Sequence, residues 1–137
     1  MTNNDIIYDK ISENYFYLEQ IMGAFYDGNL NYEELLPALE EEKEKLVGTI
    51  NDCEEDELVD KLSEVIKFTD DIMNSIYNKS IDNKEVIPTL IELGLIILKA
   101  QEYVAGNDEY LLTRIHDKKT VLIKPPTKPK KYQLVRK

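Results

Sequence analysis

Apolar side chains recur every three or four positions along roughly the first hundred residues, which is the spacing of one face of an α-helix. In residues 5–27 the repeating positions are Ile7, Ile11, Tyr15, Leu18, Met22 and Phe25. The same spacing returns in three further segments, which start near Asn31, Asp52 and Asp82. The pattern therefore predicts an all-α chain with about four main helices.

Residues that favour helix ends flank these segments. Asp5 is expected to cap the first helix and Gly28 to end it. The later helices have a start signal in which an Asn or Asp is followed three positions later by a Glu: Asn31 with Glu34, Asp52 with Glu55, and Asp82 with Glu85. Gly106 is expected to end the fourth helix. Pro37 leaves two alternatives, because the second helix either begins near Leu36 or is kinked at the proline.

The second and third helices are expected to separate an apolar from an acidic face. In the second helix the predicted buried residues are Leu35, Leu39, Leu46 and Ile50, and the predicted solvated residues are Glu40, Glu41, Glu42 and Glu44. Glu41 is placed to pair with Lys45 one turn later. In the third helix the predicted buried residues are Leu58, Leu62, Val65, Thr69, Ile72 and Ile76.

The fourth helix, residues 82–105, is apolar around most of its circumference, so it must be central in the fold or covered by a second chain. Residues 108–115 fit a short fifth helix or one further turn. Residues 121–123 are β-prone and favour a short strand, and three of the five prolines follow. We expect an antiparallel bundle over residues 1–117 and a basic, proline-containing extended tail over residues 118–137.

Charge is distributed unevenly between these two parts. The chain of 137 residues has a net charge of −10. Residues 1–115 carry 26 acidic and 9 basic side chains, whereas residues 116–137 carry 1 acidic and 8 basic side chains. An acidic body repels phosphate, so we expect no direct nucleic-acid binding and no binding to anionic membranes. The start of the chain lacks a secretory pattern and residues 86–98 are too few to span a bilayer, so we expect a cytoplasmic protein.

Few residues are suited to catalysis or metal binding. The chain has one histidine, His116, and one cysteine, Cys53, whose acidic neighbours should raise its thiol pKa. Residues 27–31 open like a calcium loop, but Tyr32 stands where the loop needs glycine and Ala38 where it needs glutamate. Di-metal bundle sites need several histidines. We therefore expect no catalytic residue, no metal and no cofactor.

Three groups of residues are candidates for binding a partner. Phe16, with Tyr17 beside it, is expected to form an exposed aromatic patch on the first helix. Glu54, Glu55 and Glu57 belong to a dense acidic surface that is suited to imitating nucleic-acid phosphates. Lys128, Lys130 and Lys131 belong to the basic tail, which is expected to contact the acidic body of its own chain or a neighbour; recognition by an SH3-type groove is the alternative.

Two families show a partial resemblance. The spacing over residues 14–77, with Leu18, Met22, Leu62 and Asp70, resembles the three-helix GAT bundles of endosomal adaptors, which bind ubiquitin. Residues 39–47 resemble the acidic helical export chaperones of bacterial flagella. Each resemblance covers half of the chain or less and consists of spacing that any antiparallel bundle shows, so neither identifies a family.

The function that these features favour is non-enzymatic binding of a protein partner, as an adaptor, an inhibitor or an assembly chaperone. One alternative is an acidic nucleic-acid mimic that blocks a DNA- or RNA-handling enzyme. The other alternative is a structural component that forms homo-oligomers through its apolar fourth helix.

Overall fold

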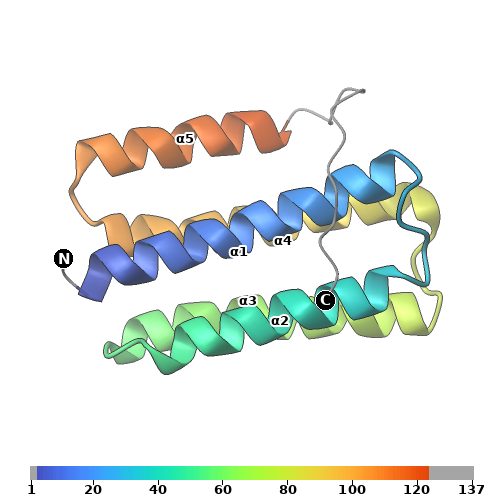
Figure 1. The fold of residues 1–137 in the computed structure, drawn as a ribbon, viewed down its shortest axis with the longest axis horizontal. Helices are drawn as coiled ribbons and strands as arrows, with labels where there is room; N and C mark the ends of the chain where they lie inside the picture. Colours follow the sequence, from blue (N-terminus) through green and yellow to red (C-terminus); the bar gives the residue numbers. More distant parts are fainter. Residues whose placement is uncertain (1–2, 124–137) are drawn as a thin grey trace.

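The computed structural model describes residues 3–123, which form five α-helices joined by short connections (Figure 1). The helices are α1 (Asn3–Tyr26), α2 (Leu35–Asn51), α3 (Asp56–Tyr77), α4 (Asn83–Ala105) and α5 (Glu109–Ile123). Consecutive helices run in opposite directions (Figure 1). The described residues contain no strand, so the all-α prediction is confirmed for this part of the chain.

Helices α1 to α4 surround a common core, and α5 packs on the outside of this group. α1 and α3 each pack against both α2 and α4, and α5 packs against α4 (Figure 1). The apolar helix α4 therefore has neighbours from the same chain on three sides, in agreement with the central position that its composition allowed. None of the described helices is both long enough and apolar enough to cross a membrane.

The ends of α4 agree with the sequence prediction. Asp82 Oδ1 accepts hydrogen bonds from the backbone N–H groups of Lys84 at 2.9 Å and Glu85 at 3.2 Å. In return, Glu85 Oε1 accepts from the backbone N–H of Asp82 at 2.9 Å. This capping box satisfies amides that the first helical turn leaves unpaired. Gly106, with a φ of 60°, follows the last residue of α4.

The start of α2 resolves the alternatives that Pro37 left open. Asn31 and Glu34 form the expected reciprocal hydrogen bonds, but these close a turn that precedes the helix. α2 itself begins at Leu35, so Pro37 lies in its first turn. A proline costs little there because the amide it lacks would be unpaired in any case.

Two other predicted start signals are wrong. Asp5 lies inside the first turn of α1 rather than before it. Asp52 ends α2 instead of beginning α3, because its backbone N–H still donates to Thr49 O at 3.1 Å. The Asp52 carboxylate forms an ion pair with Lys10 of α1. α3 begins at Asp56.

The buried faces of α3 and α2 differ in how well the sequence predicts them. All six predicted residues of α3 are buried: Leu58, Leu62, Val65, Thr69, Ile72 and Ile76. In α2 the prediction for Glu42 is wrong, because this side chain is 0% exposed. Glu42 lies one helical turn from both Leu39 and Leu46, so it shares their inward direction, whereas Glu40 and Glu44 point to solvent.

The strand expected at residues 121–123 is also wrong. α5 continues as a helix to Ile123 and is longer than the segment 108–115 that the sequence indicated. Ile115 of α5 is fully buried, and Lys119 Nζ lies 2.6 Å from Glu102 Oε2 of α4. β-propensity depends strongly on context, and residues 121–123 continue a helix that packs against α4.

The boundary predicted at residue 118 falls within α5, since residues 118–123 are helical. Residues 124–137, which include Lys128, Lys130 and Lys131, lie outside the described part of the chain.

Candidate functional site

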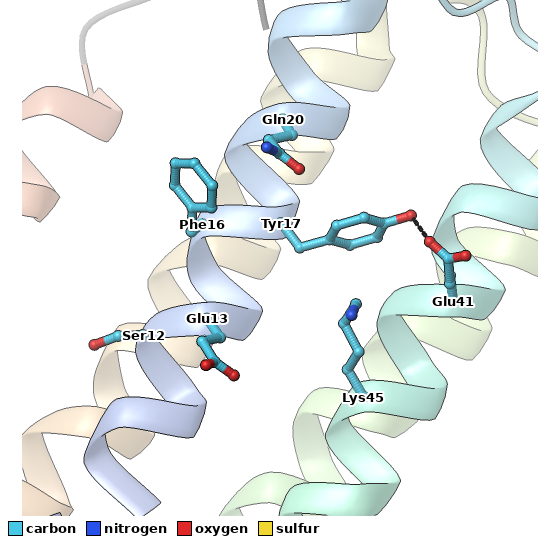
Figure 2. Close-up of a pocket in the computed structure, with 7 residues that line it drawn as sticks. All are labelled: Ser12, Glu13, Phe16, Tyr17, Gln20, Glu41 and Lys45. Carbon is cyan, nitrogen blue, oxygen red and sulfur yellow. Dashed lines mark hydrogen bonds between the residues drawn. The ribbon is translucent and has the colours of Figure 1, made fainter. Parts of the chain in front are cut away.

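A surface groove of about 440 Å³ lies between α1 and α2 (Figure 2). Its lining residues are Ser12, Glu13, Phe16, Tyr17 and Gln20 from α1 and Glu41 and Lys45 from α2. We call it the α1–α2 groove. Phe16, which the sequence singled out as an exposed aromatic residue, lies at its edge.

The two neighbouring aromatic residues of the groove have different surroundings. Successive residues of a helix point about 100° apart, so Phe16 and Tyr17 cannot face the same way. Phe16 is 54% exposed, whereas Tyr17 is 7% exposed and points toward α2 (Figure 2). The expectation that Tyr17 belongs to an outer patch therefore needs correction: its ring is a buried wall of the groove. Phe16 alone supplies a large exposed apolar surface there.

Polar contacts across the groove fix the position of Tyr17. Its hydroxyl donates to Glu41 Oε2 (Figure 2), and Lys45 Nζ lies 5.2 Å from the centroid of its ring. Glu41 and Lys45 therefore both contact Tyr17 instead of forming the expected i,i+4 ion pair with each other. A cation over a tyrosine ring and a hydrogen bond to a carboxylate both favour a fixed orientation, so this wall is preorganised.

The surroundings of the groove are acidic. Glu13 on α1 and Glu40 and Glu44 on α2 are exposed, and Glu41 is half-buried at the rim. The Ser12 hydroxyl oxygen already accepts hydrogen bonds from Gln101 Nε2 at 2.5 Å and from Lys118 Nζ at 3.4 Å. The arrangement can bury an apolar group against Phe16 and attract a cation to the carboxylates around it.

Most of the groove was not predicted from the sequence. Ser12, Phe16 and Gln20 are spaced by four residues and so lie along one line of α1. This spacing could have identified the α1 side of the groove from the sequence. The choice of α2 as the opposite wall had no signal in the sequence, because it depends on which helices become neighbours.

The acidic candidates lie apart from the groove. Glu54 and Glu55 belong to the connection between α2 and α3, Glu57 lies in the first turn of α3, and all three are exposed. Tyr103 of α4 donates to Glu55 Oε2 at 2.7 Å. This hydrogen bond, with burial as the second cause, raises the pKa of Tyr103 to about 12. The contact ties the connection to α4 and does not bring the acidic residues to Phe16.

Cys53 and His116 are the residues whose side chains the sequence analysis considered for catalysis or metal binding. Cys53 is half-buried, its Sγ lies 3.3 Å from Thr49 O, and burial followed by the nearby Asp52 carboxylate raises the pKa of its thiol. This direction agrees with the sequence prediction, and a raised pKa disfavours the thiolate. His116 is exposed on α5, as expected. Residues 3–123 hold no group of three His, Cys, Asp or Glu side chains placed to bind a metal ion.

Glu42 is an acidic residue whose side chain is fully buried in the described part of the chain. Neither of its carboxylate oxygens has a hydrogen-bond partner among the described residues. Burial raises the pKa of the Glu42 carboxyl well above its ordinary range, and Lys45 opposes this shift only in part. A carboxyl without partners in an apolar core is far less costly when protonated, so burial favours the protonated form of Glu42.

The chain matches no known protein family, and no curated protein or solved structure is significantly similar to it. The two partial resemblances noted in the sequence thus gain no support from these comparisons. A functional proposal therefore has to rest on the residues of the α1–α2 groove.

Proposed function

We propose that this chain is a non-enzymatic protein-binding protein, of the adaptor, inhibitor or assembly-chaperone kind, that captures a basic segment of its partner in the α1–α2 groove. The observation that carries the proposal is Phe16, an aromatic side chain that is 54% exposed at the edge of a groove with acidic surroundings. Aromatic residues in such positions are frequent anchors of protein interfaces.

The groove also defines the chemistry of the partner. Phe16 and the ring of Tyr17 offer apolar contact, while Glu13 and Glu41 favour cations. A suitable segment has a large apolar side chain flanked by Lys or Arg. The apolar side chain would be buried against Phe16, and the Lys or Arg would lie near the carboxylates. Charge complementarity of this kind raises the association rate and selects against acidic segments.

A selection experiment tests this proposal. Random twelve-residue peptides are displayed and selected against the full chain, and the enriched peptides are tested by titration against variants. We expect enrichment of peptides that combine an apolar residue with Lys or Arg. Phe16→Ala should weaken their binding by about tenfold, which is typical of an interface anchor.

The matched control is Tyr77→Ala. Tyr77 is 77% exposed at the end of α3, and its loss should leave peptide binding unchanged. Enrichment of acidic peptides, or peptides whose affinity Phe16→Ala does not alter, would contradict the proposal.

The nucleic-acid mimic remains a second candidate, favoured by the clustering of Glu54, Glu55 and Glu57 at one end of the bundle. It requires that reversing these three charges abolishes inhibition of a nucleic-acid enzyme while Phe16→Ala has no effect. Self-assembly through α4 has less support, because α1, α3 and α5 already pack against that helix. Light scattering at micromolar concentration distinguishes a monomer from an assembly.

A further inference from the structure

The chain leaves the described fold beside the α1–α2 groove. α5 and α1 run in the same direction (Figure 1), and the hydroxyl of Tyr15 donates to the backbone oxygen of Lys118 at 3.3 Å. Lys118 Nζ also lies 3.4 Å from Ser12 Oγ, and Ser12 lines the groove. α5 ends at Ile123, which is only about 7.5 Å farther along a helix axis from Lys118.

The residues that follow have the composition that the groove favours. Residues 3–123 contain all 27 acidic side chains of the chain and 11 of its 17 basic ones. Residues 124–137 contain the other 6 basic side chains and no acidic one. They also contain Tyr132, Leu134 and Val135, which are side chains of the kind that an exposed Phe16 can cover.

The segment is also long enough. Fourteen residues span up to roughly 46 Å when extended. The α1 residues that line the groove run from Ser12 to Gln20, which is about 12 Å along a helix. A segment tethered this close acts at an effective concentration on the order of millimolar, so even weak attraction is sufficient for occupancy.

We propose that residues 124–137 of this chain bind in its own α1–α2 groove and compete there with the protein partner. The inference rests on the proposed function, since it names the regulation of the same groove. A partner must then displace the segment, and its apparent affinity falls by the fraction of molecules in which the groove is free. Because the contact depends on charge, salt weakens the self-association.

Paramagnetic relaxation in the full chain tests the contact directly. Cys53→Ser removes the native thiol, and Gln133→Cys carries a nitroxide spin label. At about 50 mM salt we expect strong broadening of the amide signals of residues 12–20 and 41–45. The broadening should disappear in Glu13→Lys/Glu41→Lys and should decrease by at least half at about 500 mM salt.

Control variants show whether the broadening depends on charge at the groove itself. Asp60→Lys/Glu64→Lys makes the same charge change at exposed positions of α3 and should leave the broadening unchanged. Since Glu41 holds the Tyr17 hydroxyl, Glu13→Lys alone serves as a variant that leaves this contact intact and should still reduce the broadening. Mixing spin-labelled chain with unlabelled, isotope-enriched chain should give no broadening at low protein concentration.

Competition separates this inference from the proposed function. The variant Lys128→Ser/Lys130→Ser/Lys131→Ser should bind the selected basic peptides about tenfold more tightly than the natural chain at low salt. Equal affinities, broadening elsewhere, or broadening only in the mixed sample would overturn the inference. Peptides that bind both chains equally and still require Phe16 would leave the proposed function standing alone.

Discussion

α2 and α3 lie side by side and contribute to one core, but their buried faces differ in kind. The face of α3 consists of five apolar residues and Thr69, whose hydroxyl donates to Val65 O at 2.8 Å. The face of α2 includes Glu42, a carboxyl without a partner among the described residues. Angular position on a helix therefore decides burial, even where the side chain is poorly suited to it.

The largest expected effect is on the face of α3. Leu62 is fully buried, so Leu62→Ala should lower the free energy of unfolding by about 2–5 kcal/mol through lost transfer energy and a cavity. Urea unfolding measures it. Ser63→Ala, at the exposed neighbouring position, should change stability by less than about 0.5 kcal/mol. A small loss at Leu62 would mean that the apolar face of α3 is not tightly packed.

Glu42→Leu should change the free energy of unfolding in the opposite direction. The substitution removes a buried carboxyl that has no partner among the described residues and fills its place with apolar atoms, so the free energy of unfolding should rise by about 1–3 kcal/mol at neutral pH. The control Glu44→Leu, at an exposed position, should have little effect. Destabilisation by Glu42→Leu would indicate that the carboxyl makes a favourable contact.

The pH dependence of stability also distinguishes the buried face of α2, which contains Glu42, from the buried face of α3. The pKa of Glu42 is raised in the fold from its ordinary value of 4.5, because burial disfavours the charged form. The folded state therefore binds the proton more tightly than the unfolded chain does. The contribution of this group is fully present below pH 4.5 and is lost as pH rises toward the folded pKa.

Comparison with Glu42→Gln isolates this effect. Natural chain and variant should have similar stability near pH 4, and the variant should become the more stable of the two as pH rises. Urea unfolding between pH 4 and pH 8 measures the difference. Parallel curves over that range would show that Glu42 has an ordinary pKa.

A smaller effect distinguishes two Asp residues that look alike in the sequence. Asp82→Ala removes the N-cap of α4 and should cost about 1 kcal/mol. Asp52→Ala removes only an exposed ion pair with Lys10, which is worth less than about 1 kcal/mol, and no helix start. Thermal unfolding measures the loss of stability in each variant. If Asp52→Ala destabilises the chain as much as Asp82→Ala does, Asp52 also stabilises a helix end.

The smallest expected change concerns Phe16. Since this side chain is 54% exposed, Phe16→Ala should alter the free energy of unfolding by less than about 0.5 kcal/mol while it weakens peptide binding. Calorimetry of the variant measures the stability. A loss of several kcal/mol would mean that Phe16 belongs to the core and would remove the basis of the proposed binding site.

The sequence predicted those features that local chemistry decides. The stripe of α3 and the capping box of Asp82 and Glu85 were confirmed residue by residue, because the stripe follows from the helical period and the capping box from contacts within three positions. The helical state of residues 121–123 was not predicted, since these residues continue the helix α5 in spite of their local β preference. Of the candidate site, the sequence identified Phe16 and assigned Tyr17 the wrong orientation.

Two outcomes belong to the tertiary structure alone. The sequence by itself determined that this chain forms amphipathic helices with an acidic exterior, because periodicity and charge are properties of the order of residues. Only the packing of α1 against α2 decided that Glu41 and Lys45 meet Tyr17, and that a groove forms beside Phe16. Such contacts join residues far apart in the chain, and their geometry exists only once the helices have chosen their neighbours.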